Sequence, residues 1–333
     1  MIETVSLAKS YKHKPAVDNI SFKVDTGKVT GFLGPNGAGK STTMRLMLGL
    51  DRGQGTTTYD GRQLSDYILP SKVVGILLEA KAFHPTRSAR NHLRVLADAG
   101  NIPQARVEEV LDVVGLHEVA TKAPGKFSLG MSQRLGIAAA ILGNPKYLLL
   151  DEPANGLDPE GIAWLRTFIR SYAGQGNAVF VSSHLLSEMA HMADNIVVIG
   201  KGKLIASTTV SALINSNGRS SVFVRTSSLS KLERVLRQRL LVFSRDNDGL
   251  VVEGIHTDDI GKLAYDAGLP ILELANRSAS LEEAYLQLTA DSEEYKTHTL
   301  GSAGSAGAVG TASPAAVTTA KTKLVAKSKV AKP

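Results

Sequence analysis

Cysteine is missing from this sequence of 333 residues. Disulfide bonds, thiolate zinc sites and cysteine nucleophiles are therefore excluded, and the composition fits a reducing cytosol. The sequence also lacks a run of 18 apolar residues, because its most apolar stretch, residues 135–150, is interrupted by Asn144, Pro145 and Lys146. The amino terminus has no basic segment followed by an apolar one. We expect neither a membrane-spanning helix nor a secretory signal.

Acidic residues are fewer than basic ones, 31 against 38, which gives a formal net charge of +7. Part of the excess comes from residues 291–333, which hold six lysines and three acidic residues. The remaining charge is ordinary for the chain's size, so charge alone does not predict a nucleic-acid partner. Residues 291–333 also contain few large apolar side chains, too few to offset the entropy of ordering. We predict a disordered tail there.

A glycine-rich segment matches the phosphate-binding pattern G-x-x-x-x-G-K-[ST]. It reads Gly34-Pro35-Asn36-Gly37-Ala38-Gly39-Lys40-Ser41-Thr42. The apolar residues 29–33 before it predict a buried strand, and residues 42–48 after it predict a helix whose positive end faces the loop. Backbone N–H groups of such a loop surround phosphate oxygens. Lys40 would contact the β- and γ-phosphates, and the Ser41 hydroxyl would bind Mg²⁺.

Two further predicted strands end in residues suited to phosphate chemistry. The apolar strand 147–150 is followed directly by Asp151 and Glu152. At the end of a parallel strand Asp151 can hold Mg²⁺, and Glu152 can polarise the water that attacks the γ-phosphate. His184 follows the strand 178–182 and could sense the γ-phosphate. An exposed acidic turn and a structural histidine are the simpler alternatives.

Residues Ser128-Leu129-Gly130-Met131-Ser132-Gln133 begin a predicted helix, with Ser128 as its N-cap. With the other motifs, this segment makes the chain resemble the ATP-binding subunits of ABC transporters over about residues 1–215. The resemblance implies that Ser128, Gly130 and Gln133 belong to the family's signature and contact the ATP, and that Asn155-Gly156-Leu157-Asp158 is its D-loop. It also implies that Asp151 binds magnesium, that Glu152 is catalytic, that His184 is the switch histidine, and that Tyr11 stacks on adenine.

Two positions depart from the family pattern. Leu129 replaces the first glycine of the signature, and Glu79 stands where a glutamine usually lies, at the hinge of the helical region. The carboxylate of Glu79 could still bind Mg²⁺. Both departures resemble a subgroup of drug- and bacitracin-export ATPases, whose carboxyl-terminal extension is also similar to residues 217–290.

The chain as a whole is predicted to be α/β. Residues 1–216 would form a P-loop NTPase core with an antiparallel β subdomain and a helical subdomain at about 85–145. Residues 217–290 alternate as βαββαβ and would form a small α+β accessory domain, followed by the tail 291–333.

The resemblance implies an ATPase that uses ATP and Mg²⁺ and that dimerises with a second copy around ATP. It would be peripheral to the cytoplasmic face of the cell membrane and power a separate transmembrane permease that exports a drug, an antibiotic or a peptide. A soluble ABC ATPase acting on nucleic acid or ribosomes is the alternative, although this chain has one ATPase domain and no long coiled coil. A non-catalytic ATP-binding regulator is a third, supported only by Leu129 and Glu79.

Overall fold

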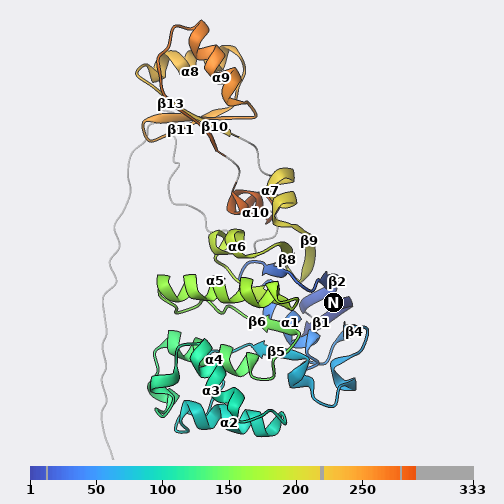
Figure 1. Cartoon of the computed structure of the whole chain (residues 1–333). Coiled ribbons are helices and arrows are strands. Elements are labelled where there is room, and N and C mark those ends of the chain that lie inside the picture. Colours follow the sequence, from blue (N-terminus) through green and yellow to red (C-terminus); the bar gives the residue numbers. More distant parts are fainter. Residues whose placement is uncertain (13, 218–220, 278–279, 290–333) are drawn as a thin grey trace, which may run out of the picture. The chain divides into compact units, whose positions relative to one another are not determined.

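A six-stranded sheet forms the centre of the first 217 residues in a computed structural model that describes residues 1–12, 14–217, 221–277 and 280–289 (Figure 1). Its strand order is β5-β6-β7-β3-β8-β9, and only β9 runs antiparallel to its neighbour. The strands are β3 (Val29–Leu33), β5 (Val74–Leu77), β6 (Tyr147–Leu150), β7 (Ala178–Ser182), β8 (Asn195–Gly200) and β9 (Lys203–Thr209).

Each central strand reads as a continuous apolar run because both faces of the sheet are covered. Alternate residues of β3 enter two different cores, with Val29 and Leu33 in one and Phe32 in the other. The second core joins Phe32 to Phe22 and Phe180, whose ring centroids lie 4.9 to 5.9 Å apart. Phe22 belongs to a three-stranded antiparallel sheet, β2-β1-β4. Its strands are β1 (Ile2–Tyr11), β2 (Lys14–Val24) and β4 (Gln54–Tyr59).

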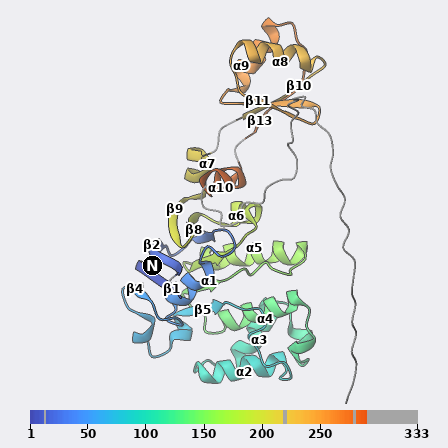
Figure 2. The same ribbon diagram turned by 180° about the vertical axis from the view of Figure 1, so that it is seen from behind.

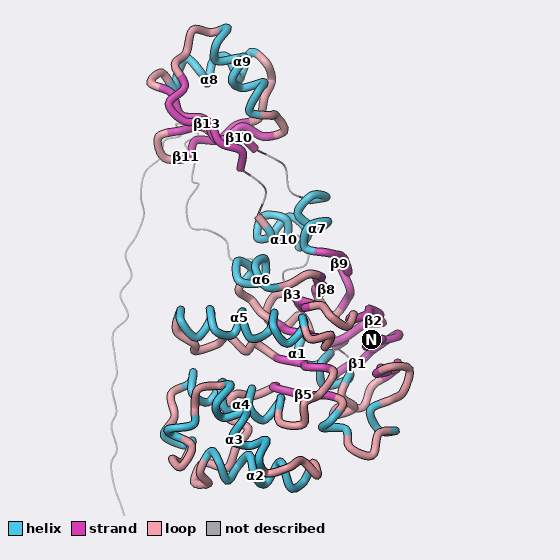
Figure 3. The backbone as a smooth tube through the Cα atoms, viewed as in Figure 1, coloured by secondary structure: helices cyan, strands magenta, loops and turns pink. Residues whose placement is uncertain are grey.

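Helices follow the strand ends and form a separate group beyond β5 (Figure 3). In that group, Ser88 and Ser128 cap α2 and α4 by accepting hydrogen bonds from backbone N–H groups three residues later. The described α-helices up to residue 192 are α1 (Lys40–Met47), α2 (Ala89–Ala99), α3 (Ala105–Val113), α4 (Leu129–Ile141), α5 (Pro159–Gly174) and α6 (Leu186–Met192). Short 3-10 turns occupy Leu64–Asp66, Pro70–Lys72, His117–Val119 and Pro124–Lys126.

A second, smaller sheet has the antiparallel order β11-β12-β10-β13. Two helices cover one of its faces (Figure 2). Leu232 and Leu236 from the first share a core with Val222 and Val224 of the sheet. The elements follow as β10 (Ser221–Thr226), α8 (Leu229–Gln238), β11 (Phe243–Asp246), β12 (Gly249–Glu253), α9 (Thr257–Asp266) and β13 (Ile271–Arg277). This order confirms the predicted βαββαβ pattern, and with the central sheet it confirms the predicted fold class.

The last described helix, α10 (Leu281–Thr289), packs against α6 and α7 (Val210–Asn217). Leu281 and Ala284 share a core with Val210 and Leu213 of α7. We predicted that this helix would belong to the accessory domain 217–290; its apolar face is buried against α6 and α7. The domain limits themselves stay a prediction, and the predicted tail lies outside the described residues. No helix in the described ranges is long and apolar enough to cross a membrane.

Candidate active site

The phosphate loop lies between β3 and α1, and its shape depends on glycine. Gly39 has φ of 103°, and a Cβ atom there would overlap the carbonyl oxygen of Ala16. Lys40 begins α1 and is only 8% exposed. Its Nζ donates to the carbonyl oxygens of Gly34 (2.7 Å) and Pro35 (3.4 Å). The loop therefore closes around a buried ammonium group at a helix amino terminus, which is an arrangement that favours an anionic ligand.

The carboxyl ends of β3, β6 and β7 meet at one edge of the sheet because these strands are parallel. Glu152, just after β6, places Oε1 3.8 Å from Lys40 Nζ. Burial lowers the pKa of Lys40, and the nearby charges of Glu152 and Asp151 oppose that shift. The structure thus brings together the lysine and the two acidic residues predicted from two separate motifs.

Ser182, the buried last residue of β7, links both acidic residues. Its hydroxyl donates to Asp151 Oδ1 (2.5 Å) and accepts from the backbone N–H of Glu152 (2.8 Å). Glu152 adopts φ of 48°, in the left-handed region that non-glycine residues rarely occupy. The sequence interpretation missed Ser182; the available signal was a polar residue ending a strand of apolar side chains.

His184 contacts the second oxygen of the same carboxylate. Its Nδ1 lies 2.7 Å from Glu152 Oε2, and the imidazole is 52% exposed. The carboxylate of Glu152 is therefore held between Lys40 on one side and His184 on the other, with its backbone fixed by Ser182. A carboxylate oriented in this way can polarise a water molecule beside a bound phosphate.

Tyr11 reaches the far end of the phosphate loop from the end of β1. Its hydroxyl donates to Asp51 Oδ2 (3.0 Å) and also interacts with the Thr42 side chain. Partial burial, followed by the bond to Asp51, raises the pKa of Tyr11. The ring is half-exposed, and Lys9 Nζ lies 5.1 Å from its centroid. This position next to the loop is compatible with the predicted contact to a base.

The predicted magnesium ligands occupy different surroundings. Ser41 is exposed at the start of α1, and Asp151 lies at the end of β6 beside Lys40. The described residues contain no group of three or more side chains that could hold a metal ion by themselves. One hydroxyl and one carboxylate do fit Mg²⁺, which keeps several waters and takes phosphate oxygens as ligands. Glu79 is exposed, and no hydrogen bond or ion pair joins it to Asp151 in the described chain.

The signature segment begins α4, where the Ser128 hydroxyl accepts from the backbone N–H of Met131 (3.1 Å) and Ser128 remains exposed. The side chain of Leu129 packs on Gly156, and a Cβ atom added at Gly130 would lie 3.1 Å from the carbonyl oxygen of Gly156. The segment is therefore fitted against the loop that follows Glu152.

Gln133 points into that loop. It is 4% exposed, and its Nε2 donates to the carbonyl oxygens of Glu152 and Asn155, each at 3.2 Å. We predicted that Gln133 contacts the nucleotide, and that contact stays a prediction; the side chain makes these two bonds within its own chain. Within the described part of the chain, no hydrogen bond or ion pair connects residues 128–133 with residues 34–42. One chain therefore presents the phosphate loop and the signature segment as two separate surfaces.

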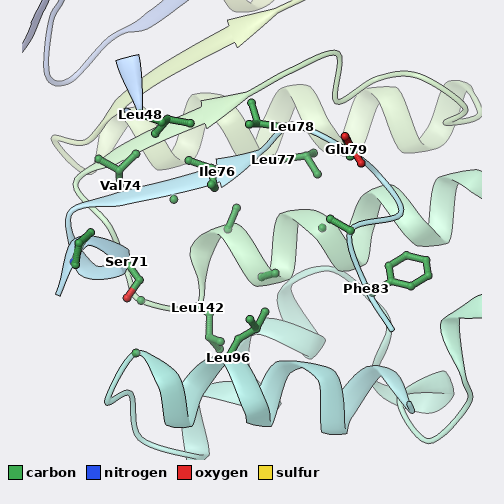
Figure 4. A pocket seen from close by; sticks show the side chains of 18 of the residues that line it. Leu48, Ser71, Val74, Ile76, Leu77, Leu78, Glu79, Phe83, Leu96 and Leu142 are labelled. Atoms are coloured by element: carbon green, nitrogen blue, oxygen red, sulfur yellow. The ribbon is translucent and has the colours of Figure 1, made fainter. Parts of the chain in front are cut away.

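An apolar cleft of about 640 Å³ lies between the edge strand β5 and the helices α2 and α4. Figure 4 shows Ile76 and Leu77 on the strand side, Leu96 and Leu142 on the helix side, and Glu79 at the end of the strand. Ile76 is 40% exposed. The cleft is thus open and lined by aliphatic side chains, as a groove for an apolar helix would be.

A family model described as ABC transporter matches residues 17–155, and a model for a domain of unknown function matches residues 220–282. The bacitracin transport ATP-binding protein BcrA of Bacillus licheniformis is 35% identical over 300 residues, which cover 86% of this chain and 97% of that protein. The lantibiotic transport ATP-binding protein SrtF of Streptococcus pyogenes is 38% identical over 206 residues, covering 62% of this chain and 89% of that protein.

Solved structures show the same fold. The structure of an ATP binding subunit of an ABC transporter superposes with a TM-score of 0.58 at 26% identity, covering 66% of this chain and 93% of that one. The dimeric, post-hydrolysis ATP-binding cassette MJ0796 bound to ADP and Pi has a TM-score of 0.58 at 21% identity, covering 63% of this chain and 98% of that one. With this similarity and the converging site residues, the chain belongs to the ATP-binding proteins of ABC transporters and is the ATPase of such a transporter.

Proposed function

We propose that this chain hydrolyses ATP as one half of a symmetric dimer and thereby drives a separate membrane-spanning exporter subunit. The observation that carries the proposal is the geometry at Glu152, whose carboxylate lies between Lys40 and His184 at the edge of the sheet. Lys40 and the loop 34–42 would hold the triphosphate. Ser41 and Asp151 would hold Mg²⁺, which supplies charge neutralisation at the phosphates.

A second copy would complete the site. The signature residues Ser128 and Gly130 lie on a surface that no described contact joins to the loop 34–42 of the same chain. In the proposed dimer, these residues of one copy would face the triphosphate bound by the loop of the other. Dimeric arrangements are known for the MJ0796 cassette, whose fold this chain shares.

The cleft beside β5 is the proposed contact for the exporter subunit. Its aliphatic lining and open edge suit the apolar face of a short helix from a membrane protein. Such a contact would place this chain at the cytoplasmic face of the cell membrane as a peripheral subunit. An antibiotic or peptide is the proposed cargo, because relatives that this chain matches are named for bacitracin and lantibiotic transport.

The site is tested by Glu152→Gln, with Glu160→Gln as the matched control. Glu160 is exposed in the first turn of α5, eight positions along the chain, and makes no contact that the mechanism uses. We expect Glu152→Gln to bind ATP, to form an ATP-dependent dimer and to lose hydrolysis by roughly 10³-fold, whereas Glu160→Gln keeps wild-type turnover. Normal hydrolysis in Glu152→Gln would overturn the assignment.

The cargo is tested in the cell that encodes this chain by replacing the chromosomal copy with Lys40→Ala. Sensitivity to bacitracin and to lantibiotics should rise, while Lys203→Ala, an exposed lysine on β9, should leave it unchanged. Unchanged sensitivity to both compound classes in Lys40→Ala would remove antibiotic export from the proposal.

A further inference from the structure

The small domain of residues 221–277 distributes its charges unevenly between its two helices. On α8 and its C-cap the only acidic side chain is Glu233, which pairs with Arg245 at 2.5 Å. The basic side chains there are Lys231, Arg234, Arg237 and Arg239. The acidic side chains of α9 are Asp258, Asp259 and Asp266, with Lys262 as its one basic residue. The surface over α8 is therefore cationic, and the surface over α9 is anionic.

The basic residues of α8 face away from the domain core. Leu232 and Leu236 are fully buried, while Lys231 and Arg234, three positions apart, share the opposite side of the helix. Arg237 lies over the ring of Phe243, 5.4 Å from its centroid. Among the described residues, no ion pair involves Lys231, Arg234 or Arg239. These charges are directed to the solvent without an acidic partner.

Leu240, directly after α8, is an unusual residue for its position. It has φ of 55° and is 92% exposed. Its N–H donates to the carbonyl oxygen of Arg237, and the N–H of Leu241 donates to that of Leu236, each at 3.1 Å. This is the hydrogen-bond pattern of a helix end whose left-handed residue is usually glycine. Local folding would therefore favour glycine here, so the exposed leucine has no folding explanation.

A second exposed aliphatic residue follows at once. Val242 is 59% exposed, whereas Leu241, between the two, packs against the core of the domain. Two aliphatic side chains thus project from one corner, immediately after a helix that carries, with its C-cap, four basic residues. We name residues 239–242 together with the outward side of α8 the α8 corner.

We propose that the α8 corner binds an anionic phospholipid surface, with Leu240 and Val242 entering the interface and the basic side chains meeting the headgroups. In a membrane interface, cationic side chains can meet the anionic headgroups while neighbouring aliphatic side chains enter the acyl-chain region below them. Nucleic acid would use the cations but offers no apolar layer for Leu240. This contact goes beyond the proposed function, since it needs neither nucleotide nor an exporter subunit.

The absence of cysteine allows a direct test on the full chain. Leu240→Cys is labelled with an environment-sensitive fluorophore and mixed with vesicles of phosphatidylcholine alone or of equal parts phosphatidylcholine and phosphatidylglycerol. We expect a blue shift only with the anionic vesicles. Tyr265→Cys is the matched control, because Tyr265 is 84% exposed on the acidic helix α9, and its label should not shift. No shift at position 240, or equal shifts at both positions, overturns the proposal.

Unlabelled variants test the energetics with the tail 291–333 unchanged in every chain. Leu240→Gly should keep or raise the Tm, because glycine suits the left-handed position, yet lower vesicle partitioning roughly tenfold. Substituting both Lys231 and Arg234 by glutamate should lower vesicle partitioning by more than roughly 25-fold. All variants should keep wild-type ATPase activity without vesicles, so failure of this proposal is distinguishable from failure of the proposed function.

Three results would refute the membrane assignment. If the Leu240→Gly protein bound anionic vesicles as well as the wild type does, Leu240 would not enter the membrane interface. Concentration-dependent self-association that the charge reversal abolishes, at unchanged vesicle binding, would assign the surface to the acidic α9 of a second copy. Oligonucleotide binding that exceeds vesicle binding and is insensitive to Leu240→Gly would assign it to nucleic acid.

Discussion

Ser182 fixes both acidic residues of the site, and Ser182→Ala measures how much that contributes. The substitution leaves Asp151 Oδ1 and the N–H of Glu152 without the hydroxyl that now bonds to both. The position is fully buried, so water does not readily replace it, and the loss is about 1–3 kcal/mol. Because Glu152 holds φ of 48°, this N–H bond also helps to keep its backbone in a rarely populated region.

We expect the free energy of unfolding of Ser182→Ala to fall by about 2 kcal/mol. We also expect kcat of ATP hydrolysis to fall roughly tenfold, which corresponds to about 1.4 kcal/mol of lost transition-state stabilisation at Glu152. The KM for ATP should change little, because Lys40 and the phosphate loop keep their contacts. Urea unfolding and steady-state phosphate release with Mg²⁺ at 20 °C measure the two effects.

Thr4→Val separates a local effect from a general loss of stability. The buried Thr4 hydroxyl also has two partners, the carbonyl oxygen (3.1 Å) and N–H (3.2 Å) of Phe22, but it lies in the antiparallel sheet. Thr4→Val should lose similar stability at unchanged kcat. A wild-type kcat in folded Ser182→Ala would refute the positioning of Glu152 by Ser182.

Three further predictions concern single side chains. His184→Ala should lower kcat roughly 10²-fold, because it removes the partner 2.7 Å from Glu152; turnover within twofold of wild type would contradict this. Leu129→Gly, made in the hydrolysis-deficient Glu152→Gln protein, should weaken the ATP-dependent dimer roughly fivefold, since this half-exposed leucine lies on the proposed contact surface; sedimentation that shows an equal or tighter dimer would refute it. Burial opposes ionisation of Asp60, yet hydrogen bonds from Lys146 and the amino terminus hold its pKa below the usual value. Asp60→Asn should therefore lower the free energy of unfolding at pH 7 by about 1 kcal/mol, and the gap should close as pH falls below about 4; a constant gap down to pH 2 would contradict the linkage.

Local sequence signals predicted the strands and helices that carry the main motifs. Apolar runs such as residues 147–150 and 178–182 are buried on both faces, so their identity as central strands follows from composition. Ser128 and Asp158 cap helices with their own side chains. Such a cap depends only on residues close in the sequence, so a local pattern can indicate it. The small domain was predicted for the same reason, since its alternation of strands and helices is regular.

Contacts between distant segments could not be predicted in this way. The role of Ser182 depends on β6 and β7 being neighbours, which brings its hydroxyl to Asp151, 31 positions away. An amphipathic pattern shows that residues 281–289 form a helix, but not that Leu281 and Ala284 are buried against α7. The sequence also does not show where the Gln133 side chain points, because its partners are backbone carbonyl oxygens, which every residue has.

The contacts of Gln133 and Leu129 connect the proposed surface for a second copy to Glu152, the proposed catalytic residue. Gln133 lies on the same helix as Ser128 and holds the carbonyl oxygens of Glu152 and Asn155. Leu129 rests on Gly156, in the same loop. In the proposed dimer, Ser128 would contact the triphosphate bound by the partner. A shift of Ser128 would move the start of α4, and the contacts of Gln133 and Leu129 would then move the backbone of Glu152 and the loop after it. Because that backbone is already held in a rarely populated conformation, a small displacement would change its geometry. The proposed dependence of hydrolysis on a second copy therefore has a physical route within each chain.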